Sequence, residues 1–190
     1  MINLHTNHRQ LVGFASGLFL LLSILIGVLP AIDAELTKPL PGIQRLSDEA
    51  QRGRELYMAE GCGACHTQFL RALPVDAPYG RGSVAADYAL EKPPMLGTQR
   101  TGPDLSNVGK RQPSEVWNLI HLYNPRAVVK SSVMPSYPWF FELSDSPSDT
   151  DIVVPVPDDF KPDNKSIIAS DDAIALVRYL QSLKQVELPL

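Results

Sequence analysis

The sequence predicts a mainly α-helical protein, with one N-terminal transmembrane helix followed by one small helical domain. Three observations indicate this fold class. One long segment near the N-terminus is apolar and uncharged, three later segments carry helix caps or an apolar period of 3.6 residues, and strand-like patterns are nearly absent. The predicted organisation is a tail at 1–10, a transmembrane helix at 11–32, a linker at 33–46 and a helical domain at 47–190.

The transmembrane helix is predicted from length and composition. Residues 11–32 contain no charged side chain over 22 positions, and a helix of that length extends ~33 Å, against ~30 Å for the hydrocarbon core of a bilayer. A cleaved signal peptide is the alternative, because the small residues Ala31 and Ala34 lie near its end. The apolar part of such a signal has only about 7–15 residues, so we expect a retained anchor surrounded by membrane lipid.

The first helix of the domain is predicted directly after the linker, which contains prolines and a glycine. Ser47 is a suitable N-cap, and Asp48 and Glu49 place negative charge in the first turn. We expect the helix to end at Gly61.

The two cysteines of the chain follow this helix at once. Cys62 and Cys65 are separated by two residues, and His66 comes directly after the second. C-x-x-C-H is the attachment pattern of c-type haem, in which both cysteines form thioethers and the histidine is the proximal iron ligand. A thioredoxin-like redox pair would require a βαβ context, and a zinc site normally requires four protein ligands. The sequence therefore predicts one covalently bound haem c.

Charges beside the apolar segment predict its orientation. Arg9 precedes the segment, whereas Asp33 and Glu35 follow it, and positive charge favours the cytoplasmic side. Covalent haem attachment in bacteria takes place on the outer face of the cytoplasmic membrane. We therefore expect the N-terminus in the cytoplasm and the haem domain in the periplasm, with the chain crossing the bacterial inner membrane once.

The second helix of the domain is predicted to begin at Pro113, Ser114 and Glu115 and to end at Asn124 and Pro125. Between these limits, apolar side chains recur at the spacing of one helix face. This predicted stripe consists of Val116, Leu119, Ile120 and Tyr123.

The third helix is predicted from an N-cap at Ser170 to Lys184, with an apolar stripe formed by Ile174, Val177, Leu180 and, less regularly, Leu183. Before it, residues 142–169 are rich in Ser, Asp and Pro, so helix is not expected there. Within this acidic insert, residues 152–156 resemble an edge strand, because Pro155 excludes a central position in a sheet.

Methionine is the expected distal ligand of a haem that carries electrons. Met134 is the preferred candidate, since it lies far along the chain in a loop with two prolines; Met95 is the competitor. Met58 precedes Cys62 by four residues and would have to reach the opposite face of the haem, and Met1 precedes the anchor. A methionine that only fills a gap in the core is the alternative for either candidate.

The ring nitrogen of His66 that does not bind iron needs a hydrogen-bond acceptor. The carbonyl of Pro103, in the segment RTGPDL, is the candidate, with an ordinary Gly-Pro turn as the alternative. His121 is expected to be a packed or partly exposed histidine of the second helix, and not a ligand.

The charge of the chain limits its partners. The formal net charge is −4 and no basic run or patch is present, so nucleic acid is not an expected partner.

Four segments carry a more specific pattern than C-x-x-C-H alone: GCGACHTQFLRAL, PYGRGSVAADY, GTQRTGPDLSNVGKR and LIHLYNPRAVVKSSVMPSYPWFF. In their order and amino-acid sequence, these segments closely resemble the membrane-anchored mono-haem cytochrome c subunit (subunit II) of cbb3-type cytochrome c oxidases. The resemblance covers roughly residues 50–141 and the anchor, and it does not extend to residues 142–169.

The resemblance implies a class I cytochrome c fold and a set of haem-binding residues. Cys62 and Cys65 correspond to the cysteines that hold the haem, His66 to its proximal ligand and Met134 to its distal ligand. Pro103 is implied as the partner of the proximal histidine in cytochromes c generally. Arg126 and Trp139 also lie in segments whose sequence matches the family, and the resemblance leaves their roles open.

The function implied is electron transfer without catalysis by this chain alone. Residues 11–32 contain no histidine, so the single anchor cannot house a haem-copper centre. The resemblance implies that electrons arrive from a di-haem cytochrome c subunit or a soluble cytochrome and pass to the haem of a catalytic haem-copper oxidase subunit. The alternatives are the anchored cytochrome c subunit of a nitric oxide reductase, a haem-based gas sensor or peroxidase, and a purely structural anchor.

Overall fold

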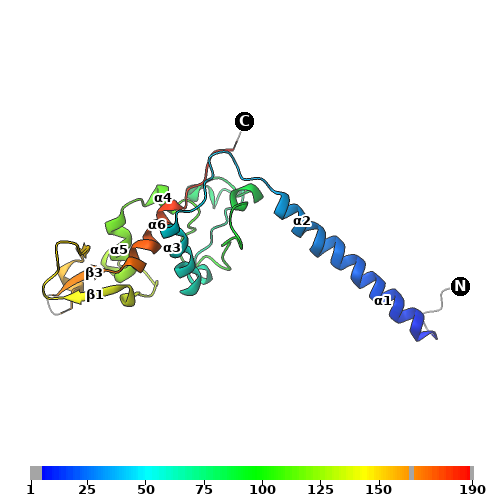
Figure 1. Ribbon diagram of the computed structural model, residues 1–190, viewed down its shortest axis with the longest axis horizontal. Coiled ribbons are helices and arrows are strands. Elements are labelled where there is room, and N and C mark those ends of the chain that lie inside the picture. Colours follow the sequence, from blue (N-terminus) through cyan, green and yellow to red (C-terminus); the bar gives the residue numbers. More distant parts are fainter. Residues whose placement is uncertain (1–5, 163–164, 189–190) are drawn as a thin grey trace. The chain divides into compact units, whose positions relative to one another are not determined.

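The computed structural model describes residues 6–162 and 165–188 (Figure 1). Two units can be distinguished. One comprises the chain up to Leu40 together with Val84–Lys92, and the other comprises Pro41–Ser83 and Pro93–Leu190. The second unit contains the predicted haem motif and the predicted iron ligands.

The N-terminal helix consists of α1 (His8–Ser23), a π-helical segment η1 (Ile24–Val28) and α2 (Leu29–Leu36), which follow one another without a break (Figure 1). Its stretch His8–Asp33 is long and apolar enough to cross a membrane. None of the most apolar 18-residue segment within it is buried by other parts of the chain. The predicted helix is therefore confirmed. The π-helical segment lies just before Pro30, whose ring and missing N–H disturb regular α-helical hydrogen bonding.

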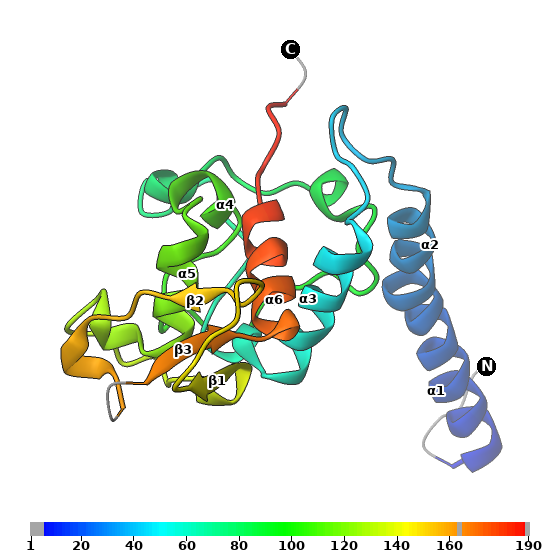
Figure 2. The ribbon, with the colours of Figure 1, turned by 60° about the vertical axis from the view of Figure 1, so that its left-hand side comes forward.

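Helices α3 (Asp48–Ala59) and α6 (Asp171–Ser182) pack against each other in the centre of the second unit (Figure 2). Each has the predicted serine cap: the hydroxyl oxygens of Ser47 and Ser170 each accept a backbone N–H three residues later at 3.2 Å. Gly53 allows the close approach, because a Cβ there would clash with the Ala175 carbonyl and lie 2.9 Å from Cβ of Tyr179.

Helix α5 (Glu115–Tyr123) packs against α6 and begins at its predicted cap, where Ser114 accepts the N–H of Trp117 at 3.2 Å. Leu119 and Ile120 are buried, as the apolar stripe predicts. Val116 was expected on the same stripe but is 47% exposed, so this part of the prediction is wrong. A short helix, α4 (Val108–Arg111), also contacts α6.

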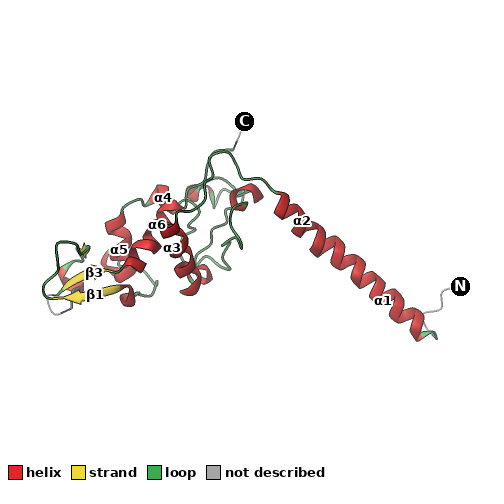
Figure 3. Cartoon of the chain, in the orientation of Figure 1, coloured by secondary structure: helices red, strands yellow, loops and turns green. Residues whose placement is uncertain are grey.

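A small antiparallel sheet forms in the insert (Figure 3). Its strands are β1 (Phe141–Ser144), β2 (Val153–Val154) and β3 (Ser166–Ala169), in the order β1-β3-β2. The predicted edge strand is present as β2, although it has only two residues. The strands β1 and β3 were not predicted. Val154 and Ile167 are neighbours in the register and both are buried, so the sheet extends the core.

Short helical turns complete the described chain: η2 (Cys62–Ala64), η3 (Ala77–Tyr79), η4 (Ala85–Tyr88), η5 (Pro125–Ala127), η6 (Pro138–Phe140) and η7 (Asp158–Phe160). The main core joins α3, α5 and α6 with the sheet, and Tyr57 packs edge-on against Tyr179 with ring centroids 5.4 Å apart. The fold is mainly helical, as predicted.

Candidate haem-binding site

The segment Cys62–His66 forms a tight turn at the end of α3. Gly61 adopts φ +68°, a left-handed conformation that ends the helix. The carbonyl of Cys62 then accepts the N–H groups of Cys65 at 3.2 Å and His66 at 3.0 Å. This turn places both cysteines and the histidine on one short, internally bonded segment.

Both cysteines are free thiols, and Cys65 is exposed. Burial raises the pKa of the Cys62 thiol to about 11, and the nearby carboxylate of Glu60 adds to the effect. Cys62 is therefore protonated at neutral pH. Two unpaired thiols three residues apart are the groups that would form the two thioether bonds of a haem c.

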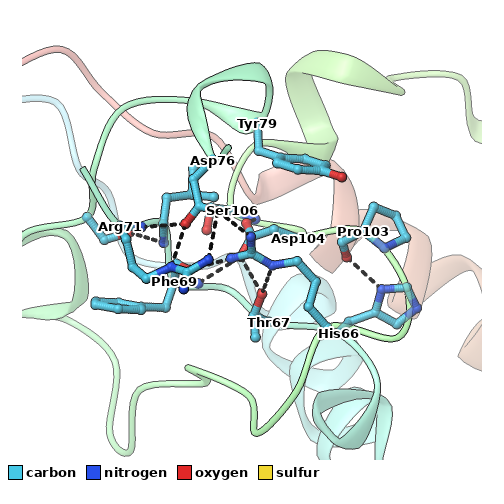
Figure 4. A network of polar contacts seen from close by, with 12 residues as sticks. His66, Thr67, Phe69, Arg71, Asp76, Tyr79, Pro103, Asp104 and Ser106 are labelled. Carbon is cyan, nitrogen blue, oxygen red and sulfur yellow. Dashed lines mark hydrogen bonds and ion pairs between the residues drawn. The ribbon is translucent and has the colours of Figure 1, made fainter. Parts of the chain in front are cut away.

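The imidazole of His66 is oriented by the residues that follow Arg100. Its Nδ1 lies 2.8 Å from the carbonyl oxygen of Pro103 (Figure 4), so Nδ1–H donates to that oxygen and the lone pair of Nε2 is left for a metal. The N–H of Gly102 donates to the carbonyl of Cys65 at 2.9 Å. The RTGPDL segment is thus held against the haem motif at two points.

A buried carboxylate fixes the chain on the other side of His66. Asp104 is fully buried and accepts the hydroxyl of Thr67 at 2.6 Å and the N–H of Phe69 at 3.0 Å. The N–H of Leu105 also donates to the carbonyl of Thr67 at 2.8 Å. Gly102, before Pro103, is therefore hydrogen-bonded to Cys65, before His66. Asp104 and Leu105, after Pro103, are hydrogen-bonded to Thr67, after His66.

Arg100 connects this carboxylate with a second one, that of Asp76. Its guanidinium donates to Asp76 at 2.6 Å, to the Phe69 carbonyl at 2.9 Å and to Thr67 Oγ1 at 2.9 Å. Asp76 is fully buried and also binds Arg71 at 3.0 Å. The hydrogen bonds that Asp76 accepts from Arg71, and to a smaller extent from Arg100, hold the pKa of Asp76 well below its usual range.

Sequence reasoning missed this network. Arg100 and Asp104 flank the predicted Pro103 acceptor and could have been noticed for that reason. Asp76 lies 24 residues before Arg100 in a loop, and no local pattern links the two. Only the folded chain brings them together.

Met134 and its competitor Met95 both pack against the main core, as does Cys62. Their backbones are held differently. The segment that contains Met95 is bonded to the haem motif itself, through Thr98 N–H to the Gly63 carbonyl and Gln68 N–H to the Leu96 carbonyl, both at 3.0 Å. The segment of Met95 is thus attached to residues close to His66, and Met134 as the distal ligand stays a prediction.

Residues on either side of Met134 differ in exposure. Val133 is 78% exposed, whereas Tyr137 is buried and contacts Trp139 edge-on with ring centroids 5.3 Å apart. The indole N–H of Trp139 donates to Glu60 at 3.2 Å. The sequence after Met134 therefore returns to the end of α3, next to Cys62.

His121 faces the same region from α5. Its ring stacks on Trp117 with centroids 4.6 Å apart, and its buried Nδ1 has no hydrogen-bond partner among the described residues. Burial lowers the pKa of His121 to about 4, and the neighbouring His66 adds to the effect. His121 is therefore neutral at pH 7, in keeping with the packed histidine that was expected.

These residues fit a covalently attached haem. Two free thiols lie on one turn with an imidazole whose Nδ1 is engaged by the Pro103 carbonyl. Among the described residues, no three His, Cys, Asp or Glu side chains are grouped so as to hold a bare metal ion.

The chain was compared with known proteins. The family model of the cytochrome c oxidase mono-haem subunit, FixO, matches residues 4–154. This match includes the anchor and every residue named above as a candidate ligand. No curated protein matches the chain.

Proposed function

Because the chain belongs to the FixO family of mono-haem cytochrome c oxidase subunits, we propose that it relays single electrons through one covalently bound haem c to the catalytic subunit of a membrane oxidase. The haem, when bound, supplies an iron couple that gains and loses one electron. The chain itself binds and orients this group and catalyses no oxygen reduction.

The observation that carries the proposal is the contact of 2.8 Å between His66 Nδ1 and the carbonyl of Pro103. It fixes the ring and leaves Nε2 for iron, directly behind two free thiols. Cys62 and Cys65 would hold the haem through thioethers, His66 would be the proximal ligand and Met134 the distal ligand. If His66 and Met134 held the iron, their fixed segments would keep rearrangement small when the charge of the iron changes.

The proposed location is the bacterial cytoplasmic membrane. The stretch His8–Asp33 would cross it once, in contact with lipid. Arg9 before the apolar segment and Asp33 behind it favour a cytoplasmic N-terminus. The haem domain would then lie in the periplasm, where haem is attached to C-x-x-C-H segments.

The proposed partners follow from the family. A subunit of an oxidase needs a catalytic subunit, and the single anchor has no histidine between residues 11 and 32 with which to bind a haem-copper centre itself. Electrons would arrive from a di-haem cytochrome c subunit or a soluble cytochrome. They would leave for the haem of the catalytic haem-copper subunit.

The test is purification of the full-length chain with its companions in mild detergent. We expect haem that stays with the polypeptide in acidified acetone, and an assembly that reduces oxygen with electrons from a reduced cytochrome. Pigment lost to the solvent would overturn the covalent assignment. Reduction of nitric oxide without oxygen reduction would indicate a nitric oxide reductase subunit, and rapid carbon monoxide binding by this haem would indicate a sensor or peroxidase.

A further inference from the structure

Arg126 holds the loop that contains Met134. Its Nη1 donates to the carbonyl of Met134 at 3.0 Å and to the carbonyl of Ser132 at 3.1 Å, and its Nη2 donates to Ser136 Oγ at 3.1 Å. One guanidinium therefore bonds the loop before, at and after the candidate ligand. A planar fork of donors is suited to such a task, and a lysine ammonium is not.

The rest of the fold holds this loop weakly. In the described chain, residues 133–136 take part in no backbone–backbone hydrogen bond; the flanking bonds are Ser132 N–H to the Val129 carbonyl and Tyr137 N–H to the Leu122 carbonyl, both at 2.9 Å. Within the loop, Met134 N–H reaches only Ser132 Oγ, at 3.3 Å. Arg126 thus provides most of the polar contacts that fix the backbone at Met134.

The position of Arg126 is itself fixed by the turn η5. Asn124 ends α5, and its side-chain oxygen accepts the N–H of Arg126 at 3.2 Å. The adjacent Pro125 is buried in the core. The guanidinium is therefore presented from a rigid turn, not from a mobile segment.

The charge of Arg126 is not neutralised by a carboxylate. All three of its acceptors are uncharged oxygens, and it forms no ion pair within the described residues. The side chain is only partly exposed, so water screens the charge incompletely. One positive charge consequently stands beside the backbone of the candidate ligand.

We propose that Arg126 is a positioning residue for the distal ligand: it holds the Met134 loop in place and, through its positive charge, favours the reduced state of the iron. This inference rests on the proposed function. Oxidised iron carries one more positive charge than reduced iron, so a nearby cation disfavours oxidation.

The test uses the full-length, haem-loaded chain purified in detergent without companion subunits. Arg126→Gln should weaken the near-infrared thioether-to-iron absorption of the oxidised protein, speed carbon monoxide binding and lower the equilibrium constant for reduction by about tenfold. Arg126→Lys keeps the charge but not the fork. We expect it to weaken the absorption, while its equilibrium constant for reduction falls less than that of Arg126→Gln because the positive charge is kept.

Lys130→Gln is the matched control, because Lys130 is exposed in the same segment and forms no hydrogen bond or ion pair with the loop among the described residues. It should leave all three readouts near those of the unmodified protein. An Arg126→Gln protein with unchanged absorption and reduction equilibrium would overturn the inference. If that variant does not accumulate with haem, Arg126→Lys decides: unmodified absorption and carbon monoxide kinetics would overturn it.

If the proposed function itself is wrong, the same measurements on the unmodified protein give a different result. The unmodified protein would then lack the thioether-to-iron absorption, or would release its pigment, whatever residue stands at 126.

Discussion

Gly102 lies directly against the imidazole of His66. A Cβ at residue 102 would stand 2.8 Å from Nδ1 and 2.9 Å from Nε2 of that ring, both closer than real Cβ contacts allow. The same ring is held by the carbonyl of Pro103. Glycine at 102 is therefore a condition for the orientation of His66 in which Nε2 is left for iron.

Gly102→Ala is expected to reduce the amount of haem bound per chain, because the added methyl group displaces the His66 ring from the Pro103 carbonyl. Haem content can be measured by the absorption of the pyridine complex against total protein. Gly63→Ala is the control, since its Cβ would meet only Gly97 Cα at 3.8 Å. Equal haem content in both variants would contradict the role assigned to Gly102.

Met134→Ala is expected to abolish the near-infrared thioether-to-iron absorption and to open the site to carbon monoxide, because the proposed distal ligand is lost. Met95→Ala serves as the comparison, since Met95 packs against the same core. Its spectrum should be unchanged. The opposite result, with the absorption lost only in Met95→Ala, would transfer the ligand assignment to Met95.

Asp76 is expected to make stability depend on pH in the acid range. Its pKa in the folded protein is lowered, first by Arg71 and then by Arg100, from an ordinary value of 3.8. A lowered pKa contributes stability above about pH 4, and this contribution is lost as the pH falls below it. Asp76→Asn should therefore lower the unfolding temperature at pH 7, and the difference from the unmodified protein should shrink below pH 4.

The control for this measurement is Asp159→Asn, because Asp159 is exposed. It should shift the unfolding temperature little at either pH. A difference between Asp76→Asn and the unmodified protein that stays constant from pH 7 to pH 3 would show that the carboxylate charge is not the cause.

Gly53→Ala is expected to destabilise the domain by about 1–3 kcal/mol, because the new methyl group would collide with the Ala175 carbonyl where α3 crosses α6. Denaturant unfolding followed by circular dichroism measures this change. Gln51→Ala on the exposed face of α3 is the control and should stay within about 0.5 kcal/mol of the unmodified protein. A Gly53→Ala protein as stable as this control would mean that the two helices can separate slightly at no cost.

Docking of a cationic electron donor on the acidic insert would be seen in the salt dependence of electron delivery, whereas a solvated loop would have no such effect. Asp149 and Asp159 are exposed on the insert, so Asn at both positions should weaken the dependence of electron delivery on salt concentration if the donor docks there. Steady-state reduction by a basic cytochrome at increasing ionic strength measures this. Glu55→Gln on α3 is the control, and an unchanged salt dependence in the double variant would leave the insert as an ordinary loop.

Substitution is preferable to deletion for this experiment. Removing residues 144–151 would also remove Ser144, which pairs with Ser166 at the end of the sheet. A loss of activity would then have two explanations.

Local signals explain which elements could be predicted from the sequence. Ser47, Ser114 and Ser170 each cap the predicted helix, because a cap and the first turn lie within four residues of each other. The haem motif is equally local. The contact between His66 and Pro103 could be anticipated only as a candidate, because 37 residues separate the partners.

The elements that escaped prediction depend on distant partners. The strand β3 pairs with β1 and β2, whose residues come 13 to 28 positions earlier along the chain, and each strand is too short for a clear alternating pattern. The bonds of Arg126 to Ser132, Met134 and Ser136 involve mostly backbone oxygens, which no sequence pattern records. The burial of Val116 was predicted wrongly, because apolar periodicity identifies one face of a helix but does not show which residues on that face other segments cover.

The crossing of α3 and α6 has a consequence for biogenesis. The chain is synthesised from its N-terminus, so α3 and the cysteines behind it are made long before residues 171–182 of α6. Until those residues arrive, α3 lacks its main packing partner and the domain cannot close. The thiols of Cys62 and Cys65 therefore remain accessible until α6 is made, and a truncation before Asp171 should yield an open polypeptide that proteases degrade.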